Sequence, residues 1–311
     1  MPSTPTSHTE LNLRVARLSV ATAALLGALK LVAGLLTGSL AIWASLVDSV
    51  MDLVASGVNY LAVRVSGQPA DADHAYGHGK AEALAGLMQA GVVGFSGAFL
   101  LVEGVRKILG GGEIARLDLG IAVMVISTLA SAWITWKLRS TARKTGSLAL
   151  AADAVHYASD VWTNLGVLFA LVLVRWTNII WFDGVVAALV ALVVLWSAVQ
   201  VLRRSTDELM DRALPPDELA TLETAVREAV PELRGMHDIR TRKVGPTLFM
   251  DCHVQLDRDQ SFVDAHRLTE RVRIAVEAER PGAVVTIHAD PDPLLPSDLD
   301  DLRGDDLRSP A

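Results

Sequence analysis

The sequence predicts a two-part protein: an all-helical membrane domain with six transmembrane helices, followed by a small α+β domain in water. Three observations lead to this prediction. Hydrophobic residues make up 51% of the 311 residues, which is high for a soluble domain. Ala, Val, Leu and Gly dominate up to about residue 205, and the pattern of hydrophobic residues changes after Asp207. The expected parts are an N-terminal cytoplasmic tail, a membrane domain, a soluble domain and a disordered acidic tail, at residues 1–13, 14–206, 207–293 and 294–311.

Six apolar segments in the first part are long enough to cross a bilayer, whose core requires about 20 residues of helix. The second, third and fifth of these segments carry polar residues, so their ends are less sharply marked. The N-terminus lacks the basic start and cleavage pattern of a secretory signal, so we expect the first segment to be retained. The six segments are 14–36, 40–66, 80–109, 117–139, 147–174 and 179–202.

The basic residues predict the orientation of these helices. If the helices alternate in direction, only Arg106, Lys107, Arg116 and Arg175 lie on one side of the membrane. The side richer in Lys and Arg faces the cytosol. We therefore expect a multi-pass plasma-membrane protein with both termini in the cytosol. The basic residues of the cytosolic side are Arg14, Arg17, Arg64, Lys80, Lys137, Arg139, Arg143, Lys144, Arg203 and Arg204.

The soluble domain reads as helix, strand, strand, helix, strand. Residues 215–230 have the pattern of an amphipathic helix that begins at two prolines. Residues 237–244 and 247–256 alternate in polarity around Gly-Pro, as the strands of a hairpin do. A second helix over 261–279 and a third strand over 283–290 complete an αββαβ order of about 85 residues.

Charge and cysteine content exclude several functions. The net charge of −7 lies mainly in the second part, without a basic stripe and interleaved aromatics, so we expect no nucleic-acid partner. The single cysteine, Cys252, excludes an internal disulfide framework and a metal site of several thiolates. No HExxH motif is present, which argues against an intramembrane metalloenzyme, and we expect no enzymatic activity.

Two apolar segments carry ionisable residues four positions apart. Asp48 and Asp52 share a helix face in the second segment, and His156 and Asp160 share one in the fifth. A charge at the centre of the bilayer costs about 2.5–3.5 kcal/mol on insertion scales, so three carboxylates are an improbable accident. Lys30 can pair with one of them or reach to the interface, but it cannot neutralise three. The alternative is that each pair solvates a helix end or serves packing.

Together the two pairs supply Asp, Asp, His and Asp, which is a ligand set for a divalent metal. Tetrahedral sites with nitrogen and oxygen ligands favour Zn²⁺. A divalent cation would neutralise the buried carboxylates, so we interpret Asp48, Asp52, His156 and Asp160 as a transport site whose cargo is a metal ion. Asp153, one turn before His156, is expected to act at the helix start.

The motifs "DSVMD" and "HYASD", with the loop "QPADADHAYGHGKAEAL" between the second and third segments, resemble the cation diffusion facilitator family. The resemblance extends from about residue 12 to 293. Within the family, the sequence most resembles the bacterial branch that exports zinc, cadmium and ferrous iron. It implies a Y-shaped or V-shaped homodimer of six-helix protomers in the bacterial inner membrane. It also implies a cytoplasmic ferredoxin-like domain on each protomer and an exchange of metal for protons.

The resemblance extends to residues outside the transport site. Asp71, His74 and His78 resemble a second metal site in the loop, although the same residues could form a plain solvent-exposed turn. Lys80 and Asp211 resemble a charged pair that clamps the dimer near the membrane surface.

In the soluble domain, five residues stand where the family binds metal. His288 and Asp290 are two apart on a strand and so share a face, and His253 lies on the neighbouring strand. Cys252 then points to the opposite face, into the core. Each histidine alone could be an ordinary surface residue, but together they favour a binuclear metal site that stabilises the dimer. The five are His237, His253, His266, His288 and Asp290.

The function expected from sequence is efflux of a divalent metal, Zn²⁺ or else Cd²⁺ or Fe²⁺, in exchange for protons by alternating access. Similar sites in relatives carry Co²⁺ or Mn²⁺, so the donor set does not fix the metal. Zn²⁺ is expected both as the substrate and as a structural ion in the soluble domain. The alternative is a metal-responsive membrane sensor or scaffold, which would bind metal without moving it.

Overall fold

The computed structural model describes residues 7–37, 40–110, 118–177 and 181–293. The predicted acidic tail, residues 294–311, lies outside the described residues. The chain divides into two compact units, Met1–Met210 and Asp211–Ala311. We call them the helical unit and the sheet unit.

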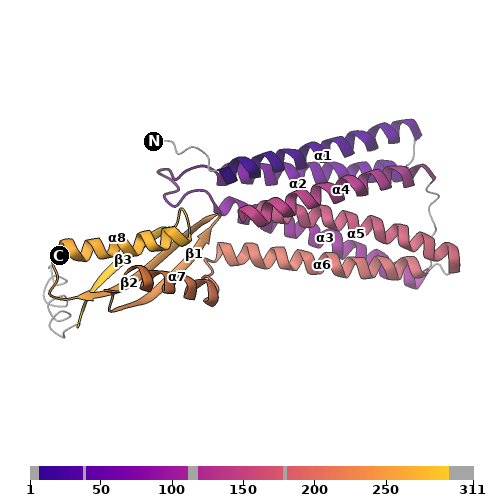
Figure 1. Ribbon diagram of the computed structural model, residues 1–311. Helices are drawn as coiled ribbons and strands as arrows, with labels where there is room; N and C mark the ends of the chain where they lie inside the picture. The colour runs from indigo at the N-terminus through magenta and orange to yellow at the C-terminus, as the bar shows by residue number, and fades with distance from the viewer. Residues whose placement is uncertain (1–6, 38–39, 111–117, 178–180, 294–311) are drawn as a thin grey trace, which may run out of the picture. The chain divides into compact units, whose positions relative to one another are not determined.

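The helical unit consists of long helices that lie side by side (Figure 1). Each coincides with one of the predicted apolar segments, apart from its ends. The first helix begins at Ser7, within the segment expected as a tail, because residues 7–13 continue its hydrogen-bonded turns. The helices are α1 (Ser7–Thr37), α2 (Leu40–Ser66), α3 (Lys80–Gly110), α4 (Asp118–Thr145), α5 (Leu148–Thr177) and α6 (Trp181–Leu209).

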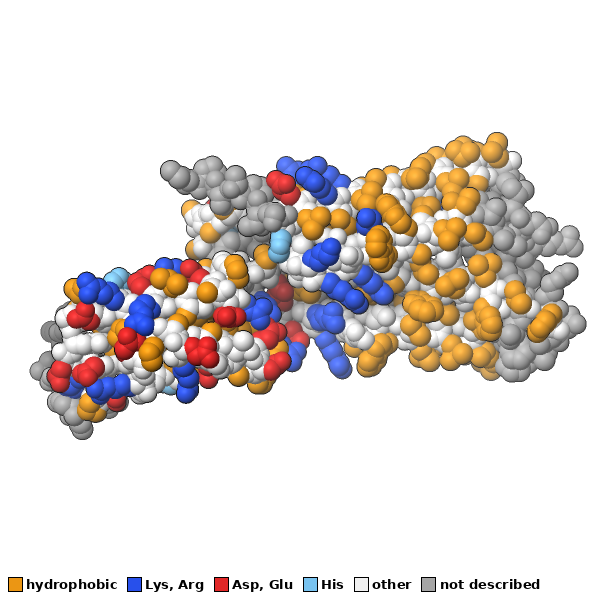
Figure 2. Space-filling model, in the orientation of Figure 1, with side chains coloured by type: hydrophobic (Ala, Val, Ile, Leu, Met, Phe, Trp, Pro, Cys, Tyr) orange, Lys and Arg blue, Asp and Glu red, His pale blue; other side chains and the backbone are white. Residues whose placement is uncertain are grey.

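Within the described residues, three helices are apolar and long enough to cross a membrane by composition alone, over His8–Leu36, Lys80–Leu109 and Gly184–Leu209. Much of the helical surface is nevertheless apolar. Leu36, Leu109 and Trp176, for example, keep 82%, 83% and 89% of their surface exposed. Figure 2 shows hydrophobic side chains over most of this unit's visible face and Lys and Arg gathered towards one end. This distribution suits a surface that faces lipid and ends at an anionic interface.

Two glycines allow α3 and α6 to approach closely. A Cβ atom at Gly104 would lie 2.9 Å from the Gly184 carbonyl oxygen, and one at Gly184 would lie 2.6 Å from that of Gly104. Neither position accepts a side chain unless the backbone moves. The two helices are therefore held together by direct backbone packing, as is common between membrane helices.

The sheet unit has the predicted αββαβ order. Helix α7 (Pro216–Ala229) has proline at its first turn, where no backbone donor is lost. Ser261 caps helix α8 (Phe262–Glu279) by accepting a hydrogen bond from the Asp264 backbone N–H. The strands are β1 (Gly235–Val244), β2 (Thr247–Asp257) and β3 (Val284–Asp292).

The three strands form one sheet in the order β1-β2-β3. Strands β1 and β2 are an antiparallel hairpin, and β3 returns parallel to β2 after the α8 crossover. Along β2, even-numbered residues are buried and join a core with side chains of both helices. Cys252 is one of these core residues, as the sequence predicted. Odd-numbered residues such as His253 face the other side of the sheet, where the candidate ligands lie.

Candidate metal centres

The structure brings together three of the four predicted transport-site residues. Nε2 of His156 on α5 lies 2.9 Å from Oδ1 of Asp52 on α2. Asp160, one turn further along α5, completes a group whose ligand atoms all lie within 4.8 Å of one another. The side chains of His156 and Asp52 are only 8% and 22% exposed. The site is thus a partly buried cluster of two carboxylates and one imidazole, shared by two helices.

The fourth predicted residue, Asp48, belongs to α2, but its side chain lies outside the described part of the structure. One turn of helix separates it from Asp52, so its Cα lies on the same side of α2. Nζ of Lys30 donates a 2.7 Å hydrogen bond to Ser49 Oγ of α2. Its role as counter-ion to the carboxylates stays a prediction.

A further carboxylate, Asp153, lies one turn away on α5, in surroundings that differ from those predicted. Asp153 was expected at the helix start, but it is fully buried. Ser19 Oγ of α1 donates to its Oδ2 at 2.6 Å, and Ser56 Oγ of α2 donates to its Oδ1 at 3.3 Å. The Tyr157 hydroxyl lies 3.1 Å from Ser56 Oγ and donates to the Ser19 carbonyl. We call these four residues the Asp153 cluster; it ties α1, α2 and α5 together.

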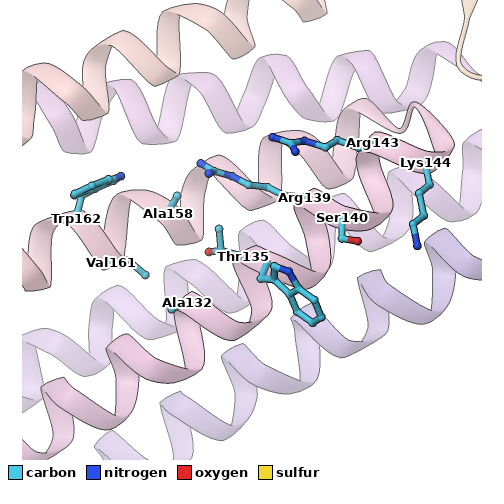
Figure 3. Close-up of a pocket in the computed structure, with 10 residues that line it drawn as sticks. Ala132, Thr135, Arg139, Ser140, Arg143, Lys144, Ala158, Val161 and Trp162 are labelled. Atoms are coloured by element: carbon cyan, nitrogen blue, oxygen red, sulfur yellow. The ribbon is translucent and has the colours of Figure 1, made fainter.

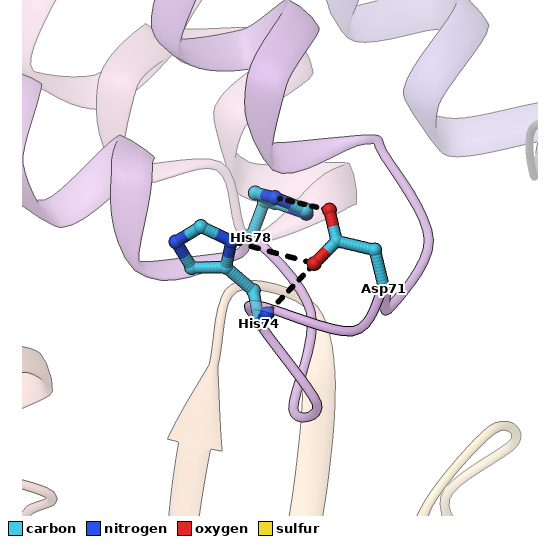
Figure 4. A group of neighbouring side chains, drawn as sticks. All are labelled: Asp71, His74 and His78. Carbon is cyan, nitrogen blue, oxygen red and sulfur yellow. Dashed lines mark hydrogen bonds and ion pairs between the residues drawn. The ribbon is translucent and has the colours of Figure 1, made fainter.

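The predicted loop site also assembles in the structure. His74 Nδ1 and His78 Nε2 lie 3.4 Å from the two carboxylate oxygens of Asp71, and the imidazole ring centroids are 4.5 Å apart (Figure 4). The backbone N–H groups of Asp73 and His74 donate to Asp71 Oδ1 at 3.0 and 2.7 Å. Gly77 follows with φ of +82°, a conformation that other residues rarely adopt, and it turns the chain back so that His78 reaches Asp71.

Backbone hydrogen bonds favour the ionised form of the Asp71 carboxyl. The backbone N–H of His74 is the largest influence on its pKa, which it holds below the usual value for a carboxyl. The carboxylate therefore stays ionised at lower pH than an ordinary aspartate. The loop is a turn in which one ligand atom from each of the three residues lies within 4.8 Å of the others, and its role in binding metal stays a prediction.

In the sheet unit, three histidines form a row across the strands. His253 on β2 is paired in register with His237 on β1 and with His288 on β3. The ring centroids of neighbouring histidines are 5.3 and 4.7 Å apart. Asp290 lies within 3.3 Å of all three, through His237 Nε2, His253 Nδ1 and His288 Nε2. The Asp290 carboxylate therefore lies within ion-pair distance of all three imidazoles.

A β-bulge aligns the first histidine with the other two. Between Val244 and Arg240 the hairpin register is regular, and its continuation would pair His237 with Val254, a core residue. The register instead shifts between His237 and Arg240, so His237 pairs with His253. Because directly opposite residues share a face, the extra residue moves His237 from the core face to the open face. The bulge also brings Asp238, with φ of 48°, into a metal-capable group with His237 and His253.

The remaining predicted residues lie apart from these groups. His266 is on α8, where its ring stacks on Phe262 with centroids 6.5 Å apart. Lys80 Nζ donates to the Leu209 carbonyl at 3.5 Å, and Asp211 accepts from Arg242 at 3.4 Å. A metal-binding role for His266 and a clamp between Lys80 and Asp211 stay predictions.

Two family models match the two units of the chain. The model of the cation efflux transmembrane domain matches residues 16–210, and that of the cation efflux protein cytoplasmic domain matches residues 214–292. The chain belongs to the cation diffusion facilitator family. The helical unit is accordingly a transmembrane domain and the sheet unit a cytoplasmic domain, as the sequence predicted. A member of this family is a cation efflux transporter in a membrane and not an enzyme.

Relatives in the family align over nearly the whole chain. The cation-efflux pump FieF of Serratia proteamaculans is 38% identical over 278 residues, which cover 89% of this chain and 92% of the relative. FieF of Klebsiella pneumoniae is 37% identical over 286 residues, which cover 91% and 95%. Among solved structures, the metal-bound C-terminal domain of the CzcD transporter from Thermotoga maritima is 30% identical. That match covers 26% of this chain and 99% of the domain, with a TM-score of 0.24.

Proposed function

We propose that this facilitator exports a divalent metal, Zn²⁺ foremost and Cd²⁺ or Fe²⁺ as alternatives, in exchange for protons. The observation that carries the proposal is the convergence of Asp52, His156 and Asp160 between two helices of the transmembrane domain. Imidazole and carboxylate are the ligands that Zn²⁺ takes in such sites. Asp48 would complete a set of four, since it stands one turn from Asp52 on α2.

Charge explains why the cargo is a cation. Two carboxylates meet beside one imidazole in a partly buried site, and this net negative charge is costly in a membrane unless a cation balances it. A divalent ion lowers that cost when bound. When the ion leaves, protons on His156 and the carboxylates can take its place.

Proton exchange follows from the same ligands. Histidine and carboxylates bind metal only in their deprotonated forms, so metal binding releases protons and protons promote metal release. We propose that the helices rock to expose the site first to the cytosol and then to the opposite side. Asp52 and His156 lie on different helices, so a change in the packing of α2 on α5 would alter the site directly.

The same proposal covers topology and assembly. All six helices would cross the bacterial inner membrane, with both termini in the cytosol, and two protomers would form the transporter. The cytoplasmic domain would have a ferredoxin-like fold, and its row of histidines with Asp290 would bind structural metal at the dimer. The loop site of Asp71, His74 and His78 would bind metal at the cytosolic entrance.

Flux through reconstituted protein tests the transport function. Asp160→Asn keeps the shape of the side chain but removes a charged ligand, and loss of even an outer-shell partner weakens metal sites 10–100-fold. We therefore expect zinc uptake into proteoliposomes, driven by a pH gradient, to fall by roughly 100-fold. Glu103→Gln is the matched control, because Glu103 is paired with Arg106 rather than with the site.

Two results would contradict the proposal. Zinc flux through Asp160→Asn at the control rate would remove the site from the transport path. Metal binding by the unmodified protein without any flux, at any pH gradient, would instead identify a sensor or scaffold. A panel of Zn²⁺, Cd²⁺, Fe²⁺, Co²⁺ and Mn²⁺ in the same assay identifies the cargo.

A further inference from the structure

A cavity of about 640 Å³ lies between α4 and α5, and its lining includes no residue of the candidate metal centres. Its walls change character along their length. Arg139, Arg143 and Lys144 line it near the end of α4, and small and aromatic side chains line the rest; Figure 3 shows Arg139 reaching towards Ala158 and Lys144 pointing away from both arginines. The apolar part consists of Ala132, Trp136, Ala158, Val161 and Trp162.

Helix periodicity explains how the cavity forms. Ala132, Trp136, Arg139 and Arg143 recur at intervals of three and four residues, so they form one stripe along α4. Ala158 and Trp162 form the corresponding stripe on α5. The two alanines leave room between the helices. Figure 3 shows Arg139 and Arg143 extending side by side along this space.

The basic end has no acidic counterpart. The residues that line the cavity include neither Asp nor Glu. Within the described residues, Arg139, Arg143 and Lys144 form no ion pair with a carboxylate. The positive charges along this wall repel a metal cation, so the cavity is a poor route to the transport site. They attract an anion, and Arg side chains are well suited to phosphate oxygens.

The dimensions match one leaflet of a bilayer. From Ala132 to Lys144, α4 rises about 18 Å at 1.5 Å per residue. Half of a bilayer's hydrocarbon core is about 15 Å thick. The basic end would therefore lie at the headgroup level while the apolar end lies among acyl chains. Trp136 and Trp162 are 62% and 52% exposed, as tryptophans near a membrane interface commonly are.

We propose that this cavity is a binding site for an anionic phospholipid. The phosphodiester of the headgroup lies against Arg139, Arg143 and Lys144, and an acyl chain lies along the alanines and tryptophans of the two helices. Basic pockets between membrane helices on the cytosolic side bind such lipids in general. The placement rests on the orientation proposed above, with the α4–α5 connection at the cytosolic face, and not on the identity of the transported metal.

Native mass spectrometry of the full-length protein in detergent measures this binding without any transport assay. The probes are dioleoyl phosphatidylglycerol and dioleoyl phosphatidylcholine, which differ in headgroup charge. Each basic residue near an anionic lipid contributes about fivefold in affinity. We expect the unmodified protein to prefer phosphatidylglycerol by at least about tenfold, and Arg139→Gln/Arg143→Gln/Lys144→Gln to lose that preference.

Matched variants separate this site from general attraction to basic residues. Lys137→Gln/Arg203→Gln/Arg204→Gln removes the same number of charges from the same end of the helices but none from the cavity, and phosphatidylglycerol affinity should stay within about threefold. Arg139→Lys/Arg143→Lys keeps the charge and should retain binding. Ala132→Phe fills the apolar end and should weaken binding of the lipid.

Several results would overturn the proposal. They are equal retention of the two lipids, equal losses in the cavity and control triple variants, undiminished binding in Ala132→Phe, and displacement of the lipid by millimolar inorganic phosphate. The last would show a simple anion site. Gel filtration and zinc binding confirm that each variant is folded, so a loss of lipid is read only from folded protein. Failure here would leave the flux test of the transport function unaffected.

Discussion

At the scale of single residues, neighbouring carboxylates on one helix face serve different purposes. Asp160 belongs to a group with His156 and Asp52 whose ligand atoms all lie within 4.8 Å of one another. Asp153, seven positions earlier on α5, accepts hydrogen bonds from Ser19 and Ser56 and is closed to solvent. Its hydrogen bonds are used to join helices, so we assign it to helix packing and not to cargo binding.

A pair of identical substitutions tests this assignment. Ser19→Ala removes a buried donor to Asp153, whereas Ser197→Ala removes a hydroxyl that bonds only its own helix, at the Val193 carbonyl. Hydrogen bonds between membrane helices contribute about 0.6 kcal/mol on average and up to about 1.7. We expect Ser19→Ala to lower the free energy of unfolding in detergent by about 1 kcal/mol, and Ser197→Ala to change it by about a few tenths of a kcal/mol. Equal effects of the two substitutions would contradict a role for the Asp153 cluster in helix packing.

The sequence predicted which side chains of the helical unit converge better than it predicted their surroundings. The spacing of His156 and Asp160 was enough to place both on one face of a helix. Asp153 shares that face with Asp160, and it differs in accepting hydrogen bonds from hydroxyls of α1 and α2. The spacing of residues along α5 does not reveal those hydroxyls. The role of Asp238 was missed for a similar reason. It depends on a bulge, and the alternation of β1 gives no sign of an extra residue.

At the scale of elements, close packing concentrates where glycines face each other. The α3–α6 pair has close backbone packing at Gly104 and Gly184, whereas Gly91, also on α3, has nothing within 4 Å of an added Cβ. The predicted helices and strands agree with the structure because apolar runs and alternation set them locally. Which glycine of α3 contacts another helix depends on how that helix packs, and the sequence of α3 alone does not show this.

Substituting alanine at two of these glycines tests whether stability depends on a glycine's contact with the neighbouring helix or only on the presence of glycine. Gly184→Ala would place a methyl group 2.6 Å from the Gly104 carbonyl oxygen, so α6 must shift away from α3. Overpacking of this kind costs about 1–3 kcal/mol. Gly91→Ala meets open space and should be neutral or slightly stabilising, since alanine favours helix by up to about 1 kcal/mol over glycine. Thermal unfolding in detergent compares the two, and a Gly184→Ala protein as stable as Gly91→Ala would contradict the packing described here.

At the scale of the whole molecule, the two units hold their candidate metal ligands in different ways. The transmembrane domain places them on two separate helices, α2 and α5. The cytoplasmic domain places them on neighbouring strands of one hydrogen-bonded sheet, with Asp290 shared by three histidines. The first arrangement suits binding and release, and the second suits a permanently bound ion.

Metal bound only by the folded form raises stability in proportion to the logarithm of its concentration, by about 2.7 kcal/mol at a hundredfold excess over Kd. We expect Zn²⁺ to raise the unfolding temperature of the cytoplasmic domain in the full-length protein, and Asp290→Ala to abolish that rise. Asp292→Ala is the control two residues along the same strand, because Asp292 pairs with Arg234. Zinc that still stabilises Asp290→Ala would place the ion elsewhere.

The chain's single cysteine provides a built-in reporter of one unit. Cys252 is 2% exposed, and burial raises the pKa of its thiol to about 11. In the folded protein a labelling reagent therefore cannot reach the sulfur, and the reactive thiolate form is scarce. A maleimide dye will therefore mark only molecules whose cytoplasmic domain has opened. Cysteines introduced into the membrane helices can be labelled selectively while the native one is left in place, which makes distance measurements across a transport cycle practical.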